Sequence, residues 1–366
     1  MIPPAPPSSA NSSNPPAVGG ASGKTGGTLL DWLLQKYPDT PRSRAKQWIL
    51  AGRVYVNGVV VRKPHQPVNV EKDSPTLGNR HATTLDCGSG WQIHPRVSLI
   101  YLDSSLAIVN KGPGLISVPA PNCELSALSI LADFLVGKLK AQQRGVAGKT
   151  LPPSYRRLDP LPVHRLDQYT SGAFCIAMNP AARHHLIEQL KAHTMQREYV
   201  AYAEGRPAAS SGTWRQWLQL SKDGLSQHII TPSQAKSAGD EACEAITHYE
   251  VVAEYPNSSG KGFYCKLRLR LETGRKHQIR AQAAYAGLPL IGDRTYNPGY
   301  RGPDLGNLTI DFPRQALHAE VLKLEHPAHL GTRMAWTAEL PKDLRRLEDD
   351  LQASVAIRKA KTIGLA

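Results

Sequence analysis

The first 27 residues differ from the rest of the chain in lacking a regular hydrophobic pattern. They consist mainly of Pro, Ser, Ala, Asn and Gly, with Lys24 as their only charged residue. Such a segment cannot bury enough apolar surface to offset its chain entropy, so we expect residues 1–27 to form a disordered tail. The segment has neither the apolar run of a secretory signal nor the arginines of a transit peptide, which indicates a cytoplasmic protein.

A change of pattern after this segment predicts a small folded unit over residues 28–75. Apolar residues first recur at helical spacing after Thr28, which suits the N-cap of a helix. Two β-branched runs then flank Asn57-Gly58, which is the strongest short-range signal for a β-hairpin. The expected elements are helices at 28–34 and 43–50 and strands at 54–56 and 59–61.

The same unit is rich in basic residues, with no acidic residue between the first and the last of them. A solvated charged face would explain this set, but a surface that binds the phosphates of a nucleic acid explains it better. The unit resembles the S4 RNA-binding module in the stretches 42–44, 52–58 and 63–64, and this resemblance implies contact with RNA. The predicted RNA-binding residues are Arg42, Arg44, Lys46, Arg53, Arg62 and Lys63.

The pattern of residues 99–345 predicts a second, larger domain in which strands and helices alternate. Short apolar runs indicate buried strands, whereas the alternation of apolar and polar residues over 267–271 indicates a half-exposed strand. The polar residues 76–98 are interpreted as a linker with at most one strand, and residues 346–366 as a C-terminal tail. The expected elements are strands at 99–101, 106–109, 173–178, 195–205 and 267–271, and helices at 126–139, at 181–192 and after Gly274.

Charge and composition narrow the class of protein. The 366 residues carry a formal net charge of +14, and an excess of this size favours a polyanionic partner such as nucleic acid or an anionic membrane. No apolar run approaches the roughly 18–20 residues that span a bilayer. The five cysteines are dispersed and lack metal-ligand spacing, so we expect reduced thiols packed as small apolar residues, and no metal site.

The sequence His164-Arg165-Leu166-Asp167 places a cluster of charge directly before the buried strand expected at 173–178. Charged groups at such a position are costly unless they are paired. Taken alone, the cluster is explained equally well by a structural Arg–Asp pair at the domain surface and by a catalytic carboxylate.

Four further stretches reduce this ambiguity. In order and separation, the five stretches 163–172, 195–205, 267–280, 287–293 and 315–319 closely resemble the RluA-type family of pseudouridine synthases. The resemblance extends from about residue 99 to about residue 344. It implies an α+β fold, in which a catalytic domain with a long mixed, largely antiparallel sheet and a central RNA cleft accompanies the small S4 domain.

The resemblance also implies roles for single residues. Asp167 matches the nucleophilic aspartate of the family, Tyr199 the tyrosine that packs on the uracil, and Arg280 the arginine that pairs with the aspartate. Arg165 matches the residue that takes the place of the everted base. The predicted catalytic residues are thus Asp167, Tyr199 and Arg280, and the predicted substrate-binding residues are Arg165, His164, Thr170, Lys276 and His277.

The reaction of this family suits these residue types. It breaks the N1–C1′ bond of uridine, turns the uracil and joins C5 to C1′, so the base first has to leave the stack, at a cost of roughly a few kcal/mol. An ionised carboxylate can act as a nucleophile or as a base toward the sugar, and Arg280 beside Asp167 would favour its charged form. Because no redox change occurs and no group is lost, we expect neither a metal nor a cofactor.

Three features depart from the usual pattern of the family. Gln168-Tyr169 replaces a basic residue followed by an acidic one, residues 110–115 contain Gly-Pro where Pro-Ala is common, and Lys276 stands where Thr is usual. None of them is one of the four matched positions. They therefore concern the choice of target and the geometry of loops rather than the reaction.

Other classes of function were weighed against this one. A non-catalytic RNA-binding protein could keep the fold, although it would not need Asp167, Tyr199 and Arg280 together. A synthetase would need glycine-rich nucleotide-binding motifs, which the sequence lacks, and a base-removing glycosylase would release free uracil. Relatives with an amino-terminal S4 module tend to act on large-subunit ribosomal RNA and shorter ones on transfer RNA. We therefore expect rRNA as the partner, with tRNA as the alternative, no membrane partner, and a monomer.

Overall fold

Short-range signals in the sequence account for most of the elements in the computed structural model. The structure describes residues 27–38, 40–50, 54–56, 59–69, 73, 75–77, 85–141, 151, 153–256, 262–299, 312–329 and 331–362. The chain forms two compact units, residues 1–81 and 82–366. Each unit is treated separately below.

The first unit has the helices and the hairpin that its sequence predicts. Thr28 caps the first helix in a capping box, in which its side chain accepts from the Asp31 amide and the Asp31 side chain accepts from the Thr28 amide. Buried apolar residues of both helices and of the strands form one core. The described elements are β1 (Gly27–Thr28), α1 (Leu29–Lys36), α2 (Arg42–Leu50), β2 (Val54–Val56), β3 (Val59–Val61), β4 (Pro67–Val68) and β5 (Pro75–Leu77).

The first unit differs from the prediction at its C-terminal boundary. Strand β5 pairs antiparallel with β2, so the small sheet extends to Leu77 rather than ending at residue 75. The expected turn Asn57-Gly58 lies outside the described residues, as does Arg53. Of the other predicted RNA-binding residues, all are exposed, namely Arg42, Arg44, Lys46, Arg62 and Lys63.

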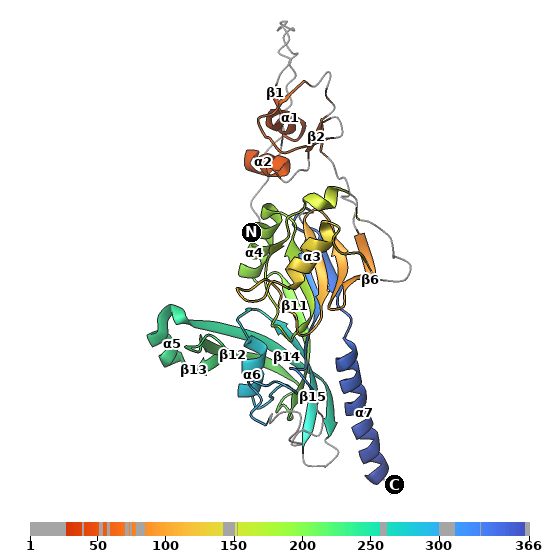
Figure 1. The fold of residues 1–366 in the computed structure, drawn as a ribbon. Coiled ribbons are helices and arrows are strands. Elements are labelled where there is room, and N and C mark those ends of the chain that lie inside the picture. The colour runs from red at the N-terminus through yellow and green to blue at the C-terminus, as the bar shows by residue number, and fades with distance from the viewer. Residues whose placement is uncertain are drawn as a thin grey trace, which may run out of the picture. The chain divides into compact units, whose positions relative to one another are not determined.

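A long, largely antiparallel sheet dominates the second unit (Figure 1). Its strand order is β13-β12-β14-β15-β11-β16-β10-β8-β7-β6, with β17 paired to β16 and β9 paired to β10. The contact between β10 and β16 is parallel and joins the two halves of the sheet. The strands are β6 (Leu85–His94), β7 (Val97–Leu102), β8 (Leu106–Lys111), β9 (Leu161–Pro162), β10 (Ser171–Ala177), β11 (Gln196–Glu204), β12 (Ser211–Leu220), β13 (Gln227–Ile230), β14 (Ala242–Pro256), β15 (Phe263–Leu271), β16 (Leu317–Glu325) and β17 (Arg333–Thr337).

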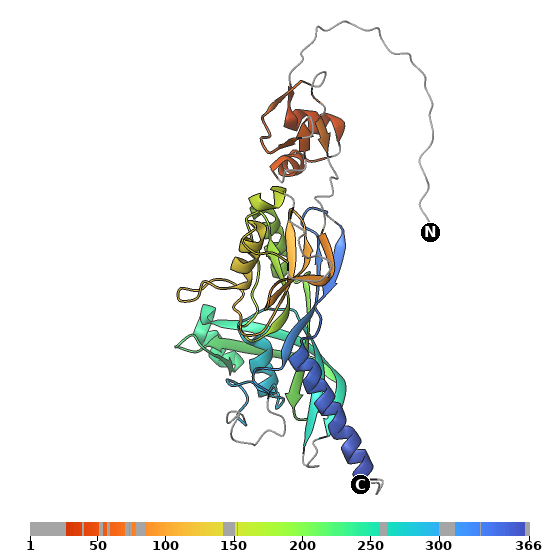
Figure 2. The same cartoon turned by 45° about the vertical axis from the view of Figure 1, so that its right-hand side comes forward.

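Helices cover this sheet from different sides. Figure 1 shows β12 and β14 extending away from the rest of the sheet, with β13 and α5 at their far end and α6 packed nearer the centre. Figures 1 and 2 both show α7 running beside β14 and β15. The helices are α3 (Ala127–Leu135), α4 (Pro180–Lys191), α5 (Pro232–Ala238), α6 (Gln278–Tyr285) and α7 (Lys342–Thr362), with short 3-10 turns at Pro153–Arg157 and Gly239–Glu241.

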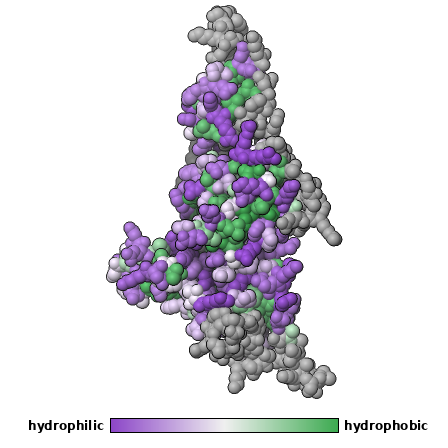
Figure 3. All heavy atoms as spheres, viewed as in Figure 1, coloured by the Kyte–Doolittle hydropathy of each residue, from purple (hydrophilic) through white to green (hydrophobic). Residues whose placement is uncertain are grey.

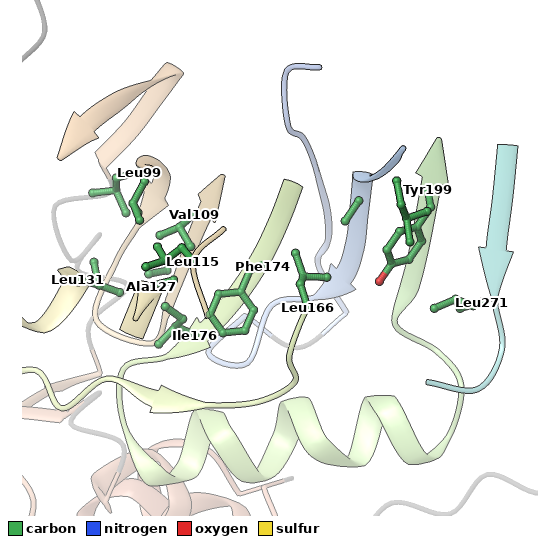
Figure 4. Packing of buried hydrophobic residues seen from close by; sticks show 14 of the residues in the cluster. Leu99, Val109, Leu115, Ala127, Leu131, Leu166, Phe174, Ile176, Tyr199 and Leu271 are labelled. Carbon is green, nitrogen blue, oxygen red and sulfur yellow. The ribbon is translucent and has the colours of Figure 1, made fainter. Parts of the chain in front are cut away.

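Strand β10 shows how the core is divided between the two faces. Successive side chains of a strand point to opposite faces, so Phe174 and Ile176 join the cluster beneath α3, whereas Cys175 joins the cluster beneath α4. Figure 4 shows Leu166 between Phe174 and Tyr199 on the first of these faces. The apolar residues 173–177 of this strand are therefore buried on both sides, which explains why their sequence does not alternate.

Two of the predicted boundaries are corrected by the second unit. The expected linker 76–98 contains strand β6, which pairs with β7 at the edge of the large sheet, so the second unit begins well before residue 99. The expected tail 346–366 belongs for most of its length to α7. Leu347 and Leu351 of this helix are buried against the sheet, and Tyr202 donates a 2.9 Å hydrogen bond to Glu348.

Figure 3 shows one face of the molecule, on which the described residues are mostly polar. In Figure 3, hydrophilic side chains cover most of the region of β12, β13 and α5, whereas hydrophobic ones gather near α3. The cysteines fit their prediction in part, because Cys175 and Cys265 are buried, while Cys243 is half-buried and Cys123 is exposed. Among the helices described, none is both long and apolar enough to cross a membrane.

Candidate active site

The side chain of Leu166 anchors the loop that carries Asp167 to the hydrophobic core. Leu166 is buried in the core, and the hydroxyl of Ser117 both accepts from its amide and donates to its carbonyl, each at 2.9 Å. Arg165 and Asp167, on either side of Leu166, line the cavity described below. The anchored Leu166 thus explains how two charged residues can precede a buried strand.

The close approach of β10 to β16 places the end of this loop. Gly172 has a φ of +121°, and a Cβ atom at this position would lie 2.1 Å from the carbonyl oxygen of Ala319. Only glycine can therefore occupy the crossing point of the two strands. Thr170 beside it is buried, and its hydroxyl accepts a 3.3 Å hydrogen bond from Gln315, so two of the sequence stretches meet here.

Arg280 lies between two carboxylates. Helix α6 carries it, and its guanidinium donates to both oxygens of Asp293 at 2.7 and 2.9 Å and to Oδ2 of Asp167 at 3.3 Å. The Arg280 side chain is 7% exposed and that of Asp293 is fully buried. Burial works against the charge of Arg280, but the hydrogen bonds and charges of Asp293 and Asp167 raise its pKa overall.

His277 approaches Asp167 from the turn before α6. It adopts a left-handed conformation with φ of 52°, and its Nε2 lies 3.9 Å from Oδ2 of Asp167. The hydroxyl of Tyr296 accepts from the Gln227 amide at 2.6 Å, so it can donate to Nδ1 of His277 at 3.1 Å and leave the ring proton on Nε2. Burial lowers the pKa of His277 to about 4, so at neutral pH it faces Asp167 uncharged.

Tyr199 forms an apolar wall of the same site. It lies on β11 and is buried in the core near Leu166 (Figure 4), and it also lines the cavity. Burial raises the pKa of its hydroxyl, so the phenol stays protonated at neutral pH. Two residues earlier, Arg197 donates to the carbonyl oxygens of Glu272 and Thr273 and so ties β11 to the turn that leads into α6.

The structure adds two residues to which the sequence gave no role. Asp293 holds Arg280, as described above. Lys111 is fully buried and contacts the loop that carries Asp167. The Lys111 ammonium donates to the carbonyl oxygens of Leu115 at 2.8 Å and of Gln168 at 3.1 Å. Burial lowers the pKa of Lys111 to about 7, although the charge of Asp167 acts in the opposite direction. Lys111 ends the mostly apolar strand β8, and a lysine in this position is a sequence signal for a buried cation with hydrogen-bond partners nearby.

The other predicted substrate-binding residues have different surroundings. Arg165 is exposed on the rim of the cavity, and Lys276 donates from Nζ to the carbonyl oxygen of Gly224. His164 also lines the cavity, but its Nε2 accepts a 3.2 Å hydrogen bond from the Cys175 amide, and burial lowers its pKa to about 3. The imidazole of His164 thus supports the backbone of β10, and its contact with substrate stays a prediction.

These residues surround a cavity of about 510 Å³ that is open to solvent. Its apolar side is formed by residues such as Tyr199 and Leu317, and its polar side by Asp167 and several cationic or imidazole groups. A second cavity of about 390 Å³ lies on the other side of the Arg165–Asp167 segment. A cavity of this size with a few converging polar groups is typical of a ligand site.

One group elsewhere in the described residues has a spacing compatible with a metal ion. It consists of Asp103, His326 and His329. Asp103 accepts from the amides of Ser105 and Leu106 and from Nε2 of His326 at 2.7 Å, while Nδ1 of His326 accepts from the Ala328 amide. These hydrogen bonds account for the buried Asp–His pair without an ion.

Comparison with known proteins points to one family. The family model described as RNA pseudouridylate synthase matches residues 105–285, and the S4 domain matches residues 28–73. Ribosomal large subunit pseudouridine synthase D of Yersinia pestis is 31% identical over 344 residues, which covers 91% of this chain and 93% of that protein. The protein of the same name from Escherichia coli K12 is 31% identical over 337 residues, or 89% and 91% of the two chains. The solved structure of human RNA pseudouridylate synthase domain containing 4 covers 69% of this chain and 92% of its own, with 20% identity and a TM-score of 0.49.

Proposed function

This chain belongs to the RNA pseudouridine synthases, and we propose that it isomerises uridine in large-subunit ribosomal RNA with Asp167 as its catalytic carboxylate. The relatives named above carry ribosomal large subunit in their names and match nearly the whole chain, including the S4 unit. Their names support rRNA over tRNA as the substrate. The cytoplasmic location and the monomeric state remain predictions from the sequence.

The observation that carries the proposal is the ion pair between Asp167 and Arg280 at the floor of the cavity. Asp293 occupies one edge of the Arg280 guanidinium, so the 3.3 Å contact to Asp167 is made by the remaining Nη1 atom. Arg280 therefore cannot swing away without breaking a buried bidentate pair. The arrangement holds the Asp167 carboxylate beside Arg280 and at the wall of the cavity, as nucleophilic attack requires.

The proposed reaction uses the two sides of the cavity differently. The target uridine leaves the stack, the Arg165 side chain on the rim takes its place in the RNA, and the uracil packs on the Tyr199 ring. Asp167 attacks the sugar at C1′ as the N1–C1′ bond breaks, and its carboxylate leaves again when C5 of the turned uracil bonds to C1′. The C5 proton is lost and N1 gains a proton, so the product is an isomer of the substrate.

The first unit supplies affinity for RNA in this proposal. Five of its predicted RNA-binding residues are described and exposed, and cations that neutralise phosphates make binding weaker as salt increases. Removing residues 1–81 should therefore lower RNA affinity by about tenfold or more near physiological salt and flatten the plot of log affinity against log salt. Turnover of a short RNA at saturation should change much less. Equal affinities and equal salt slopes for the two proteins would contradict an RNA-binding role for the unit.

Mapping of pseudouridine with carbodiimide tests the function itself. The rRNA and tRNA are compared from cells with the intact gene, with a deletion, and with an Asp167→Ala replacement. A large-subunit rRNA position that loses its pseudouridine in both altered strains would establish substrate and carboxylate together. Loss confined to tRNA would correct the substrate, whereas free uracil released from RNA by the purified protein would indicate a glycosylase.

A further inference from the structure

The second cavity adjoins the catalytic one and shares part of its wall. Both cavities are lined by the Arg165–Asp167 segment, by His277 and by Arg280. Asp167 thus lines two adjoining spaces, of about 510 and 390 Å³. The mechanism above uses only the first, which holds the everted uridine.

Two exposed hydrophobic side chains from distant parts of the chain line the second cavity. Tyr169 is 47% exposed and follows the catalytic loop, and Leu225 is 68% exposed in the turn between β12 and β13. Exposed apolar side chains that converge on one space favour a ligand with a flat apolar face. A nucleobase has such a face and stacks readily on aromatic side chains.

The turn that carries Leu225 is fixed to the active site. Lys276 donates to the carbonyl oxygen of Gly224, next to Leu225, and the amide of Gln227 donates to the Tyr296 hydroxyl at 2.6 Å. Tyr296 in turn contacts His277, which faces Asp167. Leu225 therefore lies at a defined distance from the catalytic residues, although it is exposed.

The charges around the second cavity suit a phosphate. Arg165 and Lys276 line it, and neither forms an ion pair with a carboxylate in the described part of the chain. Arg314, which also lines it, is paired with Asp343. Since Asp167 is the one acidic residue among those that line the cavity in the described part of the chain, the local charge is positive.

Departures from the usual sequence of the family gather at this same place. Gln168, Tyr169 and Lys276 all line the second cavity. Gln168 also donates from its side chain to the carbonyl oxygen of Gly114, at 3.4 Å, within the stretch 110–115 that departs as well. Residues that differ from the family pattern are thus concentrated beside the reaction centre and not in it.

We propose that the second cavity binds the nucleotide adjacent to the target uridine in the same RNA strand. Its base packs between Tyr169 and Leu225, and its phosphate lies near Lys276, while Arg165 occupies the place of the everted uridine. This inference rests on the proposed function. Eversion of a uridine removes one stacking partner from the neighbouring base. Because Asp167 lines both cavities, a uridine bound in the first cavity brings the nucleotide joined to it close to the second cavity. Tyr169 is then a specificity-determining residue of this enzyme.

The test compares the enzyme with Tyr169→Ala on two RNAs. One is an rRNA fragment with the uridine identified by mapping, and the other is the same fragment made abasic at the position before or after that uridine. Base–aromatic stacking predicts that Tyr169→Ala lowers kcat/KM on the intact fragment by about tenfold to a hundredfold. On the fragment that lacks the stacked base, wild type and variant should have nearly equal activity. Tyr169→Phe should retain most of the activity on both RNAs.

Tyr285→Ala is the matched control, since Tyr285 is 68% exposed and lines neither cavity. It should behave as wild type on every RNA. Equal losses for Tyr169→Ala on intact and abasic RNA, or no loss on either, would overturn the inference. The affinities of wild type and Tyr169→Ala for the intact and the abasic fragment are measured by anisotropy, with the same pattern expected. The inference can therefore be judged even if the wild-type enzyme forms no pseudouridine, a result that would instead refute the proposed function.

Discussion

Asp167→Asn is expected to reduce pseudouridine formation by at least about 10³-fold, because an amide can neither attack the sugar nor accept its proton. The substitution keeps the shape of the side chain, and Arg280 keeps its bidentate contact with Asp293. RNA affinity and the melting temperature should therefore stay close to those of the wild type. Turnover of an rRNA fragment, anisotropy with the same fragment and thermal melting measure the three quantities.

Two further variants make the result specific. Asp167→Ala should be as inactive as Asp167→Asn, since both lack the carboxylate. Asp133→Asn removes a carboxylate that pairs with Lys138 at the surface, outside both cavities, and should have normal activity. Normal turnover by either variant of Asp167 would refute the mechanism.

Elements with strong local signals were predictable from the sequence. The first helix begins at Thr28 as its capping pattern indicates, and β10 and β11 occupy the predicted apolar runs. Strand β6 was expected only as the one strand that the linker 76–98 could contain. It was not assigned to the large sheet, because its sequence contains glycines and few apolar residues. Its pairing with β7 includes a shift of register between Asp86 and Trp91, and such an irregular strand lacks the regular alternation that identifies a strand.

Helix α7 was missed for a different reason. Its sequence is highly charged, and the expected domain boundary at residue 345 separated Leu344 from Leu347 and Leu351. The spacing of these three leucines at three and four residues is that of one helix face, and all three are buried. The signal was present, but it is weak in a helix that contacts its sheet with only one narrow stripe.

The sequence indicated several residues of the candidate site, but it did not indicate the hydrogen bonds that connect this site to the rest of the fold. The order of the sequence stretches identified Asp167, Tyr199 and Arg280, and the structure brings all three to one cavity. The roles of Lys111 and Asp293 depend on contacts across loops. Lys111, for instance, donates to the carbonyl oxygen of Gln168, 57 residues away. No spacing rule links such residues, because backbone carbonyls have no sequence signature.

Asp293→Asn is expected to destabilise the enzyme and to inactivate it through Arg280. The Asn oxygen can still accept from the amides of Thr295 and Tyr296, but the buried guanidinium loses its full counter-charge. Breaking a buried pair in this way costs about 3 kcal/mol, which would lower the melting temperature by roughly 6–12 °C. Turnover should fall by about a hundredfold, because Arg280 no longer has a fixed position beside Asp167.

A double variant separates these two effects of Asp293. Combining Asp293→Asn with Arg280→Met removes the unpaired cation, so part of the lost stability should return. Activity should not return, since Asp167 then lacks the Arg280 guanidinium that orients its carboxylate. Melting curves and turnover of the three proteins are compared at one salt concentration. If stability and activity recovered together, Arg280 would be a structural residue whose only task is to hold Asp293. If stability recovers but activity does not, the role of Arg280 is to position Asp167 in the cavity, and the role of Asp293 is to hold Arg280 in place.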